Sequence, residues 1–343
     1  MSQLRALLPT LAIGTVGGTV FALLSMPLAW MLGAMVFTTV AAMGGRELMV
    51  PRVLRAGMIT ILGVLLGSSF TPALLDQVSR WPFTLLGLGL YLSLVTGLLF
   101  LYFWRWRGFD PATAYFSATP GGLTEMVITG AAMGGDDRTI ALVHGARILL
   151  VVLVIPFGFR YFTGVVTNPS SAGPSLAITH LDDLAVLAAC AVVGVAVGGL
   201  LRLPAYRMVG PMLASAVVHI TGITESRPPF ELVAAAQVVV GSAVGARFSG
   251  VAVRRVLGTL AASFGATALM LVLTGSFAVA LARLTGLDLA PIVLAYAPGG
   301  LTEMSLIALS LGVETAFVVT HHVARIVLIV TMAPLAFRLA RRR

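Results

Sequence analysis

The chain has 343 residues, of which 58% are hydrophobic and only 10% are charged. A soluble domain carries about 25% charged residues, so the composition indicates a protein embedded in lipid. The longest polar stretch, residues 160–183, is too short for a soluble catalytic or DNA-binding domain. The net charge of +9 rests on 22 arginines, because the sequence has no lysine. Since these arginines mostly flank apolar segments, we interpret them as topology signals and not as a nucleic-acid surface.

Apolar segments recur along the chain at nearly the length that spans a bilayer, roughly 20 residues. In the first half they lie near residues 6–24, 27–43, 53–70, 82–103, 111–133 and 139–159. The first segment could be mistaken for a signal peptide. However, Leu11–Leu24 aligns with Ala188–Leu201 in the second half. Because a removable leader would have no such counterpart, we expect this segment to stay.

The two halves of the chain repeat one another. The seven residues Pro-Gly-Gly-Leu-Thr-Glu-Met occur at Pro120–Met126 and again 178 residues later at Pro298–Met304. His144–Arg160 matches His322–Arg338 at the same offset and without a gap. We therefore predict two repeats, residues 1–165 and residues 178–343.

The orientation of the repeats depends on the fifth segment of each half. If that segment crosses the membrane, the halves are parallel, and 13 arginines fall on the cytoplasmic side against 7 outside. If it dips in and returns, the halves are inverted and the split becomes 16 to 4. Since cytoplasmic ends collect arginine, the second arrangement is favoured. The predicted fold is an all-α polytopic membrane protein with two inverted repeats, each of about five transmembrane helices plus a re-entrant hairpin.

The repeated heptamer lies inside this fifth segment. Proline cannot continue a helix and two glycines open the backbone, so a helix should break here and restart at Leu-Thr-Glu-Met. The free N–H groups and positive dipole of a restarted helix favour an anion. Two such helix starts at the bilayer midplane are typical of secondary transporters. The alternative is an ordinary loop between two spanning helices.

Ionisable residues lie close to both breaks. Glu125 and Glu303 follow the breaks, and Arg147 and Arg325 lie in the next apolar segment, each three residues after a histidine. Charged groups at membrane depth are costly and usually functional. We expect each arginine to pair with a hairpin glutamate, either as a structural ion pair or as part of a solute or coupling-ion site. The candidate binding residues are Pro120, Gly121, Gly122, Thr124, Glu125, His144, Arg147, Pro298, Gly299, Gly300, Thr302, Glu303, His322 and Arg325.

Other polar residues have simpler interpretations. His321 and His322 are neighbours on a helix and point about 100° apart, so they do not form a metal site with Cys190. We expect no metal, no cofactor and, with one cysteine, no disulfide within the chain. Asp110, Asp288, Asp136 and Glu314 precede helical segments and are predicted to cap them.

With its doubled Pro-Gly-Gly-Leu-Thr-Glu-Met motif, the chain resembles the AbrB duplication family of bacterial membrane proteins along essentially its whole length. The resemblance implies a multi-pass protein of the bacterial inner membrane. Members of that family carry the labels "ammonia monooxygenase" and "regulator of gene expression", and neither label follows from these residues. The architecture is also similar to that of the sodium-coupled glutamate and citrate symporters, which have inverted halves with re-entrant hairpins. Such a likeness of fold is an association and does not establish function.

Three functions remain in competition. The favoured one is a secondary transporter of a small anionic solute, coupled to protons or sodium, with the lipid bilayer as its surroundings and a homodimer as one option for its assembly. A membrane regulator of gene expression, acting through a partner and without its own contact to nucleic acid, is the alternative. A membrane enzyme would need a nucleophile or metal set that the sequence does not offer, so we expect no enzymatic activity.

Overall fold

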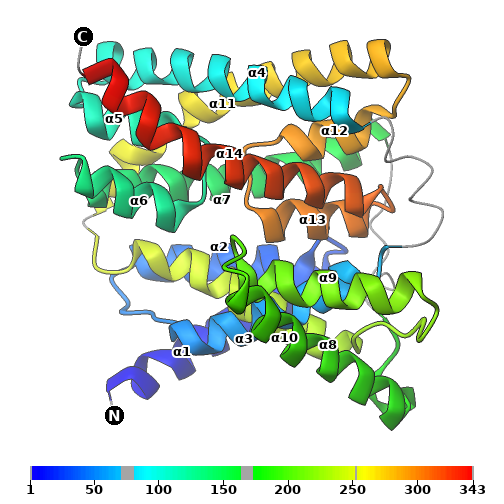
Figure 1. The fold of residues 1–343 in the computed structure, drawn as a ribbon. Helices are drawn as coiled ribbons and strands as arrows, with labels where there is room; N and C mark the ends of the chain where they lie inside the picture. Colours follow the sequence, from blue (N-terminus) through cyan, green and yellow to red (C-terminus); the bar gives the residue numbers. More distant parts are fainter. Residues whose placement is uncertain (1, 71–80, 164–172, 252, 342–343) are drawn as a thin grey trace. The chain divides into compact units, whose positions relative to one another are not determined.

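The computed structural model describes residues 2–70, 81–163, 173–251 and 253–341. These residues form an all-helical protein, which confirms the predicted all-α class (Figure 1). The predicted repeat boundary at residue 165 lies outside the described residues, as do three of the arginines counted above, Arg80, Arg342 and Arg343.

The helices follow the predicted apolar segments closely. The bounds of the helices in the first half of the chain are α1 Ser2–Leu23, α2 Ala29–Met43, α3 Arg52–Gly67, α4 Trp81–Leu101, α5 Pro111–Ala118, α6 Leu123–Ala132 and α7 Asp137–Thr163. Those in the second half are α8 Leu181–Leu200, α9 Tyr206–Ile220, α10 Phe230–Gly245, α11 Val253–Thr285, α12 Leu289–Tyr296, α13 Leu301–Ser310 and α14 Thr315–Arg341. Short helical turns add η3 Tyr102–Trp106, η5 Leu176–Ile178 and η6 Ala246–Phe248.

Seven helices in the described part of the chain are long and apolar enough to cross a membrane, namely those at 5–23, 81–106, 137–161, 181–200, 230–248, 257–285 and 315–340. The protein is therefore a multi-pass membrane protein by the length and composition of its helices. The other predicted crossings, α2, α3 and α9, have 15 or 16 residues. At 1.5 Å per residue each is about 23 Å long, which is short of the roughly 30 Å hydrocarbon core.

The helices form two compact units. Unit 1 comprises residues 1–77, 155–251 and 305–316, and unit 2 comprises residues 78–154, 252–304 and 317–343. Each unit draws segments from both halves of the chain. This division groups helices by packing, whereas the predicted repeats divide the chain by sequence similarity, so the repeat boundaries stay a prediction.

Unit 1 is held together by glycines that bring helix backbones into contact. α1 packs on α2 and α8 on α9, while α10 packs on α2 and α3 on α9. A Cβ added at Gly63 of α3 would lie 2.5 Å from the carbonyl oxygen of Met208 on α9. A Cβ at Gly241 of α10 would likewise collide with the carbonyl oxygen of Met31 on α2. Such close backbone approach is what small residues permit between membrane helices.

Unit 2 contains both Pro-Gly-Gly turns. α4 packs on α5 and α11, α5 packs on α6, and α11 packs on α12. The fully buried ring of Tyr91 on α4 lies 5.3 Å from the ring of Tyr296 and 5.4 Å from that of Phe277. These edge-to-face aromatic contacts join α4, α11 and α12.

Two glycines of α3 form a matched pair for testing the packing of α3 on α9, because Gly63 contacts α9 whereas a Cβ at Gly57 would have no neighbour within 4 Å. We expect Gly63→Ala to lower the free energy of unfolding by about 1–3 kcal/mol, because the methyl group must displace the backbone of α9. Gly57→Ala in the same helix meets nothing within 4 Å and should be neutral or stabilising by up to about 1 kcal/mol. Thermal unfolding of both variants in detergent checks the pair, and equal stabilities would contradict the close α3–α9 packing.

Candidate functional site

Two helical hairpins carry the repeated heptamer. The first consists of α5, the turn Thr119–Gly122 and α6, and the second consists of α12, the turn Ala297–Gly300 and α13. The predicted helix break at Pro-Gly-Gly and the restart at Leu-Thr-Glu-Met are thus confirmed. Arms of 8 to 10 residues are about 12–15 Å long. Neither arm is long enough to cross a bilayer by itself.

The start of each hairpin is set by an aspartate. Asp110 is the N-cap of α5, where its carboxylate accepts a hydrogen bond of 2.9 Å from the Thr113 N–H, and Pro111 follows at the first helical position. Asp288 holds the N-cap position of α12 but makes no side-chain capping bond. Asp136, directly before α7, accepts from the Arg138 N–H at 3.0 Å and from the Thr139 hydroxyl at 2.6 Å. The predicted capping bonds are therefore found at Asp110 and Asp136.

The heptamer packs against itself around its two glycines. A Cβ at Gly122 would collide with the carboxylate of Glu125, and a Cβ at Gly300 would collide with that of Glu303. The glycines before them are equally restricted. A Cβ at Gly121 would lie 3.0 Å from the Met126 sulfur, and its counterpart in the second hairpin would lie 2.8 Å from the sulfur of Met304. Each glycine thus leaves room for a side chain later in its own motif.

Both glutamates fold back over the start of their own helix. Gly122 is the N-cap of α6, so Glu125 occupies the third helical position, from which a carboxylate reaches the N-cap. The positive end of the helix dipole stabilises a negative charge there. The protein's own carboxylate therefore lies where the sequence predicted a site for a foreign anion. The two glutamates differ in exposure, since Glu125 is exposed and Glu303 is buried.

The buried arginines bind the turns, not the glutamates. Arg325 on α14 donates to the carbonyl oxygens of Ala297 at 2.7 Å and Gly299 at 2.6 Å. Arg147 on α7 donates to the Gly121 carbonyl oxygen at 3.4 Å. Within the described residues neither arginine forms an ion pair with a hairpin glutamate. The predicted arginine–glutamate pairing is therefore wrong, and the partners are carbonyl oxygens of the turns. The physical reason is that a broken helix frees carbonyl groups, which need donors when they are shielded from water.

The two guanidinium groups form a positively charged centre in unit 2. The two groups lie close enough to repel each other electrostatically. Arg147 and Arg325 are 4% and 3% exposed. Three of their N–H groups, Arg147 Nε and Nη1 and Arg325 Nε, have no hydrogen-bond partner among the described residues. The centre thus has unused donors as well as excess positive charge.

The two predicted histidines attach the long helices to the first arms of the hairpins. His144 Nε2 lies 2.9 Å from the Phe116 carbonyl oxygen, and His322 Nε2 lies 3.0 Å from that of Leu294. A carbonyl oxygen can only accept, so Nε2 carries the proton in both rings. Both side chains are fully buried. They position the hairpins, each 28 residues away from its carbonyl partner.

The remaining predicted residues surround the turns without a common geometry. Pro120, Gly121, Pro298 and Gly299 are buried, and Gly122 and Gly300 are half-buried. Of the two threonines, Thr302 is buried whereas Thr124 is exposed. The structure brings the arginines, the histidines and the turns together in unit 2, and it leaves Thr124 and Glu125 at the surface.

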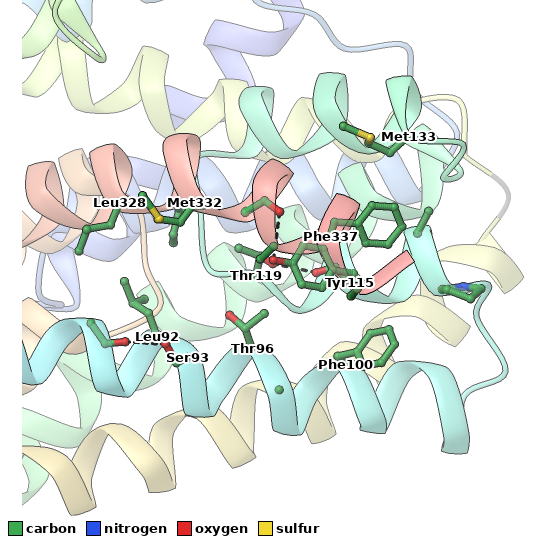
Figure 2. Close-up of a pocket in the computed structure, with 18 of the residues that line it drawn as sticks. Leu92, Ser93, Thr96, Phe100, Tyr115, Thr119, Met133, Leu328, Met332 and Phe337 are labelled. Atoms are coloured by element: carbon green, nitrogen blue, oxygen red, sulfur yellow. Dashed lines mark hydrogen bonds between the residues drawn. The ribbon is translucent and has the colours of Figure 1, made fainter. Parts of the chain in front are cut away.

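A pocket of about 920 Å³ approaches the first turn within unit 2 (Figure 2). It lies between α4, α5 and α14, and its lining is mostly apolar. Thr119, the first residue of the turn, and Ile329 of α14 line it. A Cβ at Gly121 would lie 2.7 Å from the Ile329 side chain, so part of the pocket lining contacts the turn. Its labelled side chains in Figure 2 are Leu92, Ser93, Thr96, Phe100, Tyr115, Thr119, Met133, Leu328, Met332 and Phe337.

Sequence reasoning missed a second polar group in unit 2. His321 Nε2 lies 2.8 Å from the Thr84 hydroxyl, and the Tyr296 hydroxyl donates to the Thr84 carbonyl oxygen. Tyr91, beside Tyr296, shares a 2.8 Å hydrogen bond with the Thr274 hydroxyl. The only signal in the sequence was the presence of polar groups within apolar helices.

The position of the arginines leads to a prediction about stability. If Arg147 paired with Glu125, then Arg147→Leu would leave a lone charge and Glu125→Gln would restore stability. Because Arg147 instead binds a carbonyl group, we expect the effects of the two substitutions to add within about 0.5 kcal/mol. Thermal unfolding of both single variants and the double variant measures this coupling. Recovery of stability in the double variant would contradict this and show that Glu125 is the ion-pair partner of Arg147.

Comparison with known proteins identifies the family. The family model described as "Transition state regulatory protein AbrB" matches residues 3–341. A protein of Bacillus subtilis (strain 168), "Uncharacterized protein YhjN", is 29% identical over 358 residues, covering 96% of this chain and 91% of that protein. "Putative regulator AbrB" of Escherichia coli (strain K12) is 27% identical over 321 residues, covering 92% of this chain and 90% of that protein. The chain belongs to the AbrB family.

Proposed function

We propose that this protein is a secondary transporter of a small anionic solute in the bacterial inner membrane, coupled to protons or sodium. The central site consists of the two Pro-Gly-Gly turns together with Arg147 and Arg325. The observation that carries this proposal is the pair of buried guanidinium groups without an ion-pair partner in the described part of the chain.

The charge of this centre favours an anion. A buried unpaired charge is costly, and proteins pair such charges or place them where a ligand completes them. The N–H groups without partners, Arg147 Nε and Nη1 and Arg325 Nε, suit a carboxylate, phosphate or sulfate, which guanidinium binds with charge-assisted hydrogen bonds. The glutamates do not neutralise the centre by contact, since each carboxylate folds back to its own helix start.

The pocket of unit 2 suits an access path to this centre. It contains space for a small organic molecule, and two of its lining residues, Thr119 and Ile329, lie at the first turn. Its polar groups are few, among them the Tyr115 hydroxyl, which donates to the Ala333 carbonyl oxygen at 3.2 Å. Asp110, the N-cap of α5, lies in the lining as a carboxylate. In this proposal an anion passes the apolar walls and meets the arginines at the turn.

We further propose that the two halves are inverted repeats, each with five crossings and one hairpin. Paired contacts support this proposal. His144–Phe116 and His322–Leu294 are equivalent bonds, as are Arg147–Gly121 and Arg325–Gly299. In unit 1, the contact of Gly63 with Met208 has its counterpart in that of Gly241 with Met31. An exchange of partners between α2–α10 and α3–α9 is what a two-fold relation between the repeats would produce.

A regulatory function is the second candidate, because the family description and the Escherichia coli relative both contain the word regulator. Those words describe other proteins. In this chain such a function would have to act through a partner. Transport of an effector molecule would also connect a membrane protein with gene expression, so the two proposals are compatible.

An uptake screen in proteoliposomes tests the transport proposal. The probes are phosphate, sulfate, succinate, citrate and benzoate, each with an imposed proton gradient, a sodium gradient or none. We expect at least one anion to accumulate, and Arg325→Gln to reduce its uptake by roughly tenfold or more, because the lost charged hydrogen-bond donor weakens anion binding by at least 1.4 kcal/mol.

Arg338→Gln is the matched control, since Arg338 is an exposed arginine on the same helix. Its uptake should equal that of the wild type. Equal losses in both variants, or uptake of no probe above empty liposomes, would contradict a transport site at the buried arginines.

A further inference from the structure

His321 has a hydrogen-bonding environment that suits two protonation states. Its side chain on α14 is fully buried. Nδ1 lies 2.8 Å from the Phe317 carbonyl oxygen, and Nε2 lies 2.8 Å from the Thr84 hydroxyl on α4. Because a carbonyl oxygen only accepts, Nδ1 carries a proton in either state. The question is therefore whether Nε2 carries a second one.

The hydroxyl of Thr84 has two possible acceptors for its single proton. It lies 2.8 Å from His321 Nε2 and 2.9 Å from the Trp81 carbonyl oxygen. When the imidazole is neutral, Thr84 donates to Nε2. When the imidazole is doubly protonated, Nε2 donates to the Thr84 oxygen and the hydroxyl turns to Trp81. Rotation of one hydroxyl thus satisfies both ring nitrogens in both states.

This group is connected to the second hairpin. The Tyr296 hydroxyl donates to the Thr84 carbonyl oxygen, and the Tyr296 ring lies 6.2 Å from the His321 ring. Tyr296 is the last residue of α12, directly before the turn whose carbonyl groups bind Arg325. The proton acceptor is thus connected through Thr84 and Tyr296 to the turn that Arg325 binds.

The titratable and charged groups around His321 are few. His322 and Arg325 lie on its own helix, Tyr296 faces it from α12, and Tyr91 lies behind Tyr296 on α4. In the described part of the chain no carboxylate forms an ion pair with His321. A second proton on the ring would thus add positive charge beside Arg325. A bound anion would compensate that charge.

We propose that His321 binds the coupling proton of the transporter, and that the proton and the anion bind cooperatively. This inference rests on the proposed function. A proton from one side of the membrane adds to Nε2, and the same proton leaves when the anion departs on the other side. By linkage, an anion that raises the proton affinity of His321 is itself bound more tightly when His321 is protonated. The transport assay below distinguishes this proton coupling from coupling to sodium.

The group occurs once in the described part of the chain, with Thr84 from the first half and Tyr296 and His321 from the second. At the offset of 178 residues Val143 corresponds to His321, Ala118 to Tyr296 and Ala262 to Thr84. The arginine centre has one arginine from each half, whereas the proton site has a single histidine. A single proton per transport cycle follows from this asymmetry.

Nitrogen NMR of histidine-labelled protein in lipid nanodiscs tests the proton site without any solute. The chain has only five histidines, and the signal of His321 is the one absent in His321→Gln. We expect Nδ1 to be protonated throughout and Nε2 to gain a proton as the pH is lowered to 3. Thr84→Val should lower the midpoint by roughly half a pH unit or more, because the charged state loses the stronger hydrogen bond. An Nε2 that stays unprotonated down to pH 3, or an unchanged midpoint in Thr84→Val, would overturn the site.

The transport assay then tests the coupling, with whichever anion of the uptake screen accumulates. We expect proton-driven uptake by His321→Gln to be at least about tenfold lower than that of the wild type. Solute exchange without a gradient should stay within twofold of the wild type. His180→Gln, at an exposed histidine, should leave both unchanged. Equal losses of uptake and exchange would show a structural role, and sodium-driven uptake would reject the proton. If no anion moves, the transporter proposal fails, and the NMR titration still decides on the proton site.

Discussion

A helix that breaks in an apolar environment leaves carbonyl groups without donors, and the site of this protein depends on how that requirement is met. Arg325 donates to two carbonyl oxygens of the second turn, and Arg147 donates to one of the first. The same bonds bring two positive charges into the interior of unit 2. In the proposed function, the groups that hold the hairpins also attract an anion. A structural role and a binding role would then coincide in the same two side chains.

The repeated heptamer is explained by packing within each turn. Its second glycine leaves room for the glutamate carboxylate and its first glycine leaves room for the methionine side chain. Changing one member of the motif would displace another, which gives a physical reason for the same seven residues in both halves. The glutamate then stabilises the start of its own helix. This leaves the arginine charges free for a ligand, whereas a direct ion pair would have cancelled them.

The sequence predicted the helices and the breaks well, because apolar length and the Pro-Gly-Gly triplet are local properties. The partner of the arginines could not be predicted, since Glu125 reaches an N-cap three residues away more easily than a side chain on another helix. The polar group of Thr84, Tyr296 and His321 was not predicted for a different reason. Comparing the halves selects what they share, and these three residues have apolar counterparts. Their proximity arises only when α4, α12 and α14 pack together.

The most direct test of the account is anion binding to the purified protein, measured as a rise in its unfolding temperature. A ligand that binds only the folded state stabilises it by mass action. Each probe anion is compared with a neutral analogue, such as succinate with succinamide. The account predicts that at least one anion stabilises the wild type and Arg338→Gln, but not the variant carrying both Arg147→Gln and Arg325→Gln, and that its neutral analogue has no effect. Equal stabilisation of that double variant would contradict the claim that the buried arginines form an anion site.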